Sequence, residues 1–73
     1  MLHRLQIASV SDRKKLVAEL WYGDEQWAEV NQESGKLIIQ IYQRRNGEPW
    51  SFEYNDALEL LKSAGIQLLK GAS

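Results

Sequence analysis

Apolar and polar residues alternate along four segments of the chain, the periodicity of strands that bury one face. The segments are residues 16–22, 26–32, 37–43 and 50–54. Residues 2–8 alternate more weakly, and we expect an edge strand or an ordered arm there. Residues 9–15 are polar and basic, which indicates a loop or a single helical turn.

Turn residues separate the four segments and set their register, since a shift of one residue exchanges the two faces of a strand. Ser34-Gly35, taken as a two-residue loop, places Val30 opposite Ile39. Asn46-Gly47 is typical of a type I′ hairpin turn. In the first hairpin, a two-residue Gly23-Asp24 loop places Leu20 opposite Trp27, whereas a three-residue loop through Glu25 places it opposite Ala28. We prefer the three-residue loop because it gathers the apolar residues on one face.

These registers predict one apolar face. Its members are Leu16, Ala18, Leu20, Ala28, Val30, Leu37, Ile39, Ile41, Trp50, Phe52 and Tyr54. A helix should follow and cover this face with Leu58, Leu61 and Leu68. Asp56 to Glu59 matches a capping box, and Asn55 is a second candidate cap. Gly65 either weakens the helix or marks a close contact, and Gly71 is a natural end.

The predicted fold is α+β: a four-stranded antiparallel meander with one C-terminal helix on one face, and an extra N-terminal edge strand as an option. We expect one domain over residues 16–70. Residues 1–15 would form an arm or edge strand with a basic loop, and residues 71–73 a frayed tail.

The opposite sheet face is the informative one. It should carry Trp21, Trp27, Tyr42 and Ile38, interspersed with Glu19, Glu29 and Glu53. Aromatic pairs across strands stabilise a sheet without any further role, and residues 2–8 could cover part of this face. The functional interpretation is a protein-binding surface, because tryptophan and tyrosine are enriched at the centres of interfaces.

The composition limits which metal sites, disulfides and catalytic groups the chain can contain. The chain of 73 residues has a net charge of -1, no cysteine and one histidine, His3. This excludes a disulfide framework and cysteine-ligated zinc, and we expect no other metal site, no cofactor and no catalytic activity. No segment is typical of a signal peptide or a membrane span, which favours a cytoplasmic protein.

The leading hypothesis is a non-catalytic module that binds a basic partner protein through the aromatic and acidic outer face. In length and element order the chain resembles small bacterial immunity or antitoxin proteins, which implies an inhibitor docked on a basic target such as a toxin nuclease. One alternative is a homodimer that buries the same face. Another is nucleic-acid binding through two basic clusters, made of Arg13, Lys14, Lys15, Arg44 and Arg45.

Overall fold

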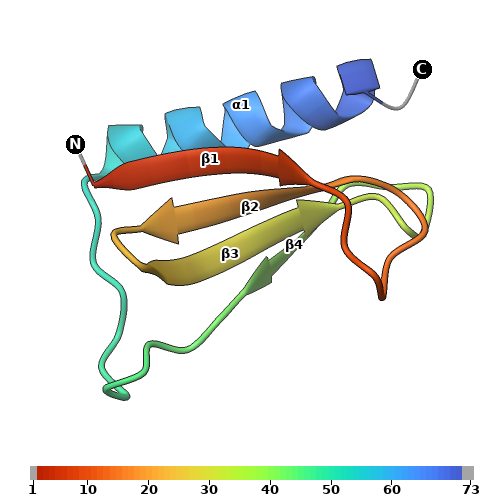
Figure 1. Cartoon of the computed structure of the whole chain (residues 1–73). Coiled ribbons are helices and arrows are strands. Elements are labelled where there is room, and N and C mark those ends of the chain that lie inside the picture. The colour runs from red at the N-terminus through yellow and green to blue at the C-terminus, as the bar shows by residue number, and fades with distance from the viewer. Residues whose placement is uncertain (1, 72–73) are drawn as a thin grey trace.

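A computed structural model of the chain describes residues 2–71 (Figure 1). Four antiparallel strands form one sheet in the order β1 (His3–Ala8), β2 (Val17–Tyr22), β3 (Glu25–Asn31) and β4 (Ile38–Ile41). One helix, α1 (Tyr54–Gly71), lies across one face of this sheet. The predicted α+β class, a four-stranded antiparallel sheet followed by a helix, is confirmed.

The membership of the sheet differs from the prediction. The N-terminal segment is the first edge strand, whereas residues 50–54 form no strand. Trp50 and Phe52 pack instead into a cluster of rings with His3, Tyr22 and Trp27, and Phe52 contacts the other four rings at 4.8 to 5.5 Å. Residues 50–54 therefore contribute aromatic rings to the core instead of a further strand.

The turn at Asn46-Gly47 explains why no hairpin forms there. The N–H of Gly47 donates to the carbonyl of Arg44 at 3.0 Å, so Arg45 and Asn46 are the central residues. A type I′ turn needs positive φ at both central positions. In the described part of the chain only glycines have positive φ, Gly47 among them at 78°, so the predicted type I′ turn is wrong.

The register between β3 and β4 is as predicted, with Val30 opposite Ile39 and Ala28 opposite Ile41. Between β2 and β3 both considered registers occur. Leu20 lies opposite Ala28, as the longer loop requires, yet Tyr22 lies opposite Glu25 across the two-residue loop. A β-bulge at Trp27 absorbs the extra residue and joins the two registers.

The core lies between the sheet and the helix row of Leu60, Ala64 and Leu68, with Leu61 at its border. Two predicted core residues near the helix are outside it, because Leu58, 46% exposed, lies on the flank of this row and Tyr54, 73% exposed, at its first turn. Four predicted core residues of the sheet are also exposed, namely Leu16, Leu37, Ile39 and Ile41. Ile39 and Ile41 are left uncovered because α1 does not pack over β4. Leu60, Ala64 and Leu68 recur every four residues, and this row is the buried face of the helix.

The helix begins earlier than the capping box predicted. The side chain of Glu53 accepts a hydrogen bond from the N–H of Asp56 at 3.0 Å, and its carbonyl accepts the first helical bond, from Ala57. Glu53 is therefore the N-cap in place of Asn55 or Asp56. At the other end α1 includes Gly71, while residues 72 and 73 of the predicted tail lie outside the described residues.

Gly65 lies within the continuous helix at a close contact. A Cβ built on it would lie 3.2 Å from Cδ1 of Leu37, the residue that precedes β4. Gly65 therefore marks a close contact and does not interrupt the helix.

Candidate functional site: the outer face and the open edge of the sheet

Trp27, the expected centre of the outer face, lies on the opposite side. Its side chain is only 4% exposed and packs on Phe52 with ring centroids 4.8 Å apart. The bulge causes this difference, since it turns Trp27 and Ala28 toward the same side of the sheet. The placement of Trp27 on the outer face was wrong, although its backbone does pair with Tyr42 as predicted.

Glu29 is the centre of a polar network on the outer face. The guanidinium of Arg13, from the loop between β1 and β2, donates to Oε2 of Glu29 at 2.9 and 3.1 Å and to Gln40 at 2.8 Å. Asn31 donates to the same carboxylate at 3.0 Å, and the hydroxyl of Tyr42 at 3.4 Å. Glu29 and Asn31 are both buried. The loop of residues 9–16, rather than residues 2–8, covers this part of the face.

The network perturbs its ionisable groups. The hydrogen bond and the negative charge of Glu29 raise the pKa of Arg13, which stays charged. Burial, with the Glu29 charge second, raises the pKa of Tyr42, so its hydroxyl stays protonated and donates. Glu29 and Arg13, the charged groups of this network, are therefore partners of each other inside the chain.

The other end of the outer face is also paired within the chain. The guanidinium of Arg4 lies 4.9 Å from the ring centroid of Trp21, a cation–π contact. The indole N–H of Trp21 donates to Glu19 at 3.3 Å. Of the predicted acidic residues, Glu19 and Glu29 are therefore held by outer-face neighbours, while Glu53 caps the helix.

The two basic clusters lie at opposite ends of the sheet. Arg45 pairs with Asp24 at 3.0 Å beside the β2–β3 turn, and the guanidinium of Arg44 lies over Trp50 at 4.9 Å. The backbone N–H groups of Lys14 and Lys15 instead bond Glu33, beyond the far end of β3. Figure 1 shows the two loops well apart. They do not form the single phosphate-binding surface that the nucleic-acid hypothesis requires.

The sheet has two edges, β1 and β4, and β4 carries exposed apolar side chains on both of its faces. Ile39 and Ile41 face the helix side and are 43% and 66% exposed, while Ile38 and Tyr42 on the outer side are also exposed. Among the described elements, α1 packs over β1, β2 and β3 and does not reach β4. Exposed apolar edge strands are the usual sites of pairing with another chain.

A groove lies between β4 and the helix. Its volume is about 220 Å³, and it is lined by Val30, Leu37, Ile38, Ile39, Leu61 and Gly65. The lining is almost wholly apolar because the helix contributes only Leu61 and Gly65 to it. The sequence signal for this surface is the run Leu37 to Tyr42, in which Gln40 is the single polar residue. Assigning each residue to one face of the sheet did not reveal that the whole strand would lie at an exposed edge.

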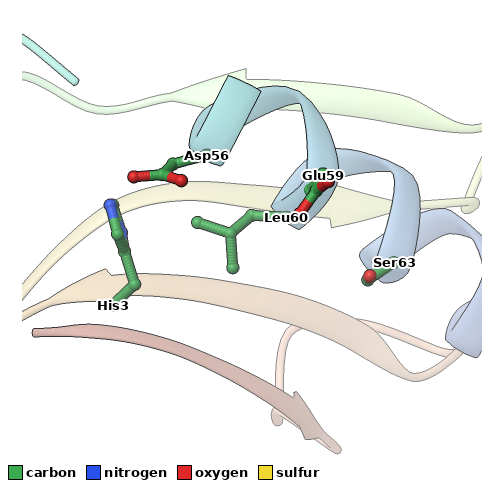
Figure 2. A pocket seen from close by; sticks show the side chains of 5 residues that line it. All are labelled: His3, Asp56, Glu59, Leu60 and Ser63. Carbon is green, nitrogen blue, oxygen red and sulfur yellow. The ribbon is translucent and has the colours of Figure 1, made fainter. Parts of the chain in front are cut away.

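A second pocket, of about 230 Å³, lies at the other side of the helix (Figure 2). His3 of β1 points toward the first turn of α1, where Asp56, Glu59, Leu60 and Ser63 complete the lining. The Nδ1 atom of His3 is buried without a hydrogen-bond partner among the described residues. The His3 ring packs edge-on against Tyr22 and Phe52, so its contacts are those of the aromatic cluster.

Residues 2–71 contain no group of three or more histidine, aspartate or glutamate side chains placed to hold a metal ion. The one helix found in this part of the chain is too polar to span a membrane. Comparisons of the chain with models of known protein families, with curated proteins and with solved structures found no match.

Proposed function

We propose that this chain is a non-catalytic protein-interaction domain that binds an extended segment of its partner along β4, as an added strand. The observation that carries the proposal is the exposed apolar edge of β4 together with the groove beside it. Strand addition is a common mode of peptide recognition, in which the backbone supplies affinity and alternate side chains supply specificity.

The backbone of β4 is oriented for this mode. The N–H of Tyr42 donates to Trp27 at 2.9 Å, so Tyr42 directs its N–H toward β3. Backbone groups of successive residues point to opposite sides of a strand, and those of Leu37, Ile39 and Ile41 therefore face the open edge. A partner strand bonded there would direct alternate side chains into the apolar groove.

The preferred partner segment is thus extended and apolar at alternate positions. The basic partner expected from the acidic outer face has less support, because Glu19 and Glu29 are engaged by outer-face neighbours and Glu53 caps α1. The protein is still proposed to be a protein-binding module, as the sequence predicted, and Ile38 and Tyr42 remain among its expected contact residues. It moves the binding surface from the centre of the sheet to its edge.

A peptide with isoleucine at alternate positions and lysine at both ends tests this proposal. In titrations followed by NMR, the amides of Leu37, Ile39 and Ile41 should shift saturably, and a peptide with proline at its centre should cause no shift. Ile39→Lys should abolish binding. Ile66→Lys is the matched control, since Ile66 is 49% exposed on α1 and does not line the groove. Absence of saturable shifts at β4 would overturn the proposal.

A further inference from the structure

We infer that the strand which fits this edge is β4 of a second copy of the chain, paired antiparallel about a two-fold axis at Ile39. The inference rests on the proposed function, because it names the partner of the same edge. Its basis is the symmetry of the residues that β4 presents, together with the placement of the charges that flank them.

The apolar residues on the helix side of β4, together with Leu37 immediately before it, are symmetric about Ile39. Opposite residues of an antiparallel pair share one face, so a two-fold axis must place a residue of β4 opposite itself. With the axis at Ile39, Leu37 lies opposite Ile41 of the second copy, and Ile39 lies opposite Ile39. Every exposed apolar residue on this side of the edge then gains an apolar partner.

Moving the two-fold axis by one residue in either direction gives less favourable pairs of opposite residues. An axis at Gln40 places Lys36 opposite Arg44 of the second copy, and like charges directly opposite each other destabilise a sheet. An axis at Ile38 places Ile41 opposite Gly35, which leaves the most exposed isoleucine of the edge unpaired. The axis at Ile39 avoids both defects, since Lys36 then lies opposite Tyr42.

The backbone agrees with this register. Leu37, Ile39 and Ile41 present their N–H and C=O groups to the open edge, and the axis at Ile39 pairs these residues only with each other. Three such pairs supply about six hydrogen bonds, two for each pair. The result is a continuous eight-stranded sheet with both helices on one face, and it brings the two apolar grooves together at the seam.

The contact is small, because it consists of two short strands and the groove walls beside them. Interfaces of less than about 1,200 Å² are generally transient. We therefore expect reversible self-association, with a dissociation constant on the order of micromolar or weaker. The fraction of dimer should therefore rise strongly with protein concentration.

Single cysteines test the axis directly, because the chain has no cysteine of its own. Residues that exchange backbone bonds have Cα atoms about 5.5 Å apart, within the range of a disulfide. Under mild oxidation, Ile39→Cys should cross-link to itself about tenfold faster than Gln40→Cys, whose copies would not be opposite each other. Faster cross-linking of Gln40→Cys would overturn the inferred axis.

Sedimentation velocity over a range of concentrations provides the second measurement. The wild type and Ile66→Lys should shift from monomer to dimer as concentration rises, and Ile39→Lys should stay monomeric because two lysines would meet at the axis. A wild type that is monomeric throughout, yet binds the alternating peptide, overturns the second-copy inference and leaves the proposed function standing. If neither association nor peptide binding occurs, both are overturned.

Discussion

Trp27 provides the sharpest test of how the sheet is built. On simple strand alternation this side chain is exposed, and its loss would cost little. In the structure a bulge turns it into the core, where it is 4% exposed and contacts Phe52. Truncation by Trp27→Ala should therefore remove a large buried ring and leave a cavity beside the aromatic cluster.

Replacing a buried tryptophan by alanine costs about 3–5 kcal/mol. A domain of this length has a free energy of unfolding of roughly 4–11 kcal/mol, so the variant should lose a large part of its stability and, at the lower end of this range, should unfold. Trp27→Phe is the informative companion. The indole N–H of Trp27 is buried without a partner among the described residues, and an unpaired buried donor costs about 1–3 kcal/mol. Removing this donor offsets much of the lost ring area, so Trp27→Phe should change stability by only about 1 kcal/mol.

Urea denaturation followed by far-UV circular dichroism measures both variants without relying on tryptophan fluorescence. The expected order of stability is wild type and Trp27→Phe close together, with Trp27→Ala far below. A loss of less than about 1 kcal/mol for Trp27→Ala is the behaviour of a surface residue. That result would refute the bulge and return Trp27 to the outer face.

Three further perturbations test other features. Gly65→Ala should stabilise the domain by about 0.5–1 kcal/mol in urea denaturation, because helix propensity rises and the half-exposed Leu37 side chain can move aside; destabilisation would mean that Leu37 is held rigidly. Glu53→Ala removes the N-cap and should cost about 0.5–1 kcal/mol in the same assay, whereas Glu53→Asp should cost less. The backbone N–H of Lys14, then that of Lys15, holds the pKa of Glu33 below its ordinary value of 4.5. The contribution of Glu33 to stability is therefore present above pH 4.5 and is lost as the pH falls through the lower pKa of the folded state. The NMR amide shifts of residues 9–16 should titrate in this acidic range, because the N–H groups of Lys14 and Lys15 bond Glu33. Glu33→Gln should remove this transition.

Much of the fold was predictable from local pattern. Alternation placed β2, β3 and β4, and the turn at Ser34-Gly35 set the β3–β4 register correctly. The position of the helix also follows from residue type and spacing. These features depend on neighbours in sequence, which is why one chain sufficed to predict them. The role of Gly65 was left open, because its close contact is with Leu37 from a distant segment.

The candidate site was less predictable. Ile38 and Tyr42 do lie exposed on β4, but Trp27 is buried, Glu29 is neutralised by Arg13 and Glu53 caps the helix. The differences at Trp27 and Glu29 depend on residues from distant segments, whereas Glu53 caps the helix that begins at the next residue. Strand alternation assigns a side chain to a face and says nothing about which loop will cover that face.

The sequence by itself determined the α+β class, the order of β2, β3 and β4 and the apolar character of β4, because hydrophobic period and turn residues act locally. Only the tertiary structure decided that residues 50–54 leave the sheet, that a bulge inverts Trp27 and that the helix stops short of β4. The physical reason is competition for burial. Phe52 packs against the rings of His3, Tyr22, Trp27 and Trp50 instead of pairing in a further strand, and β4 is therefore left as an edge of the sheet.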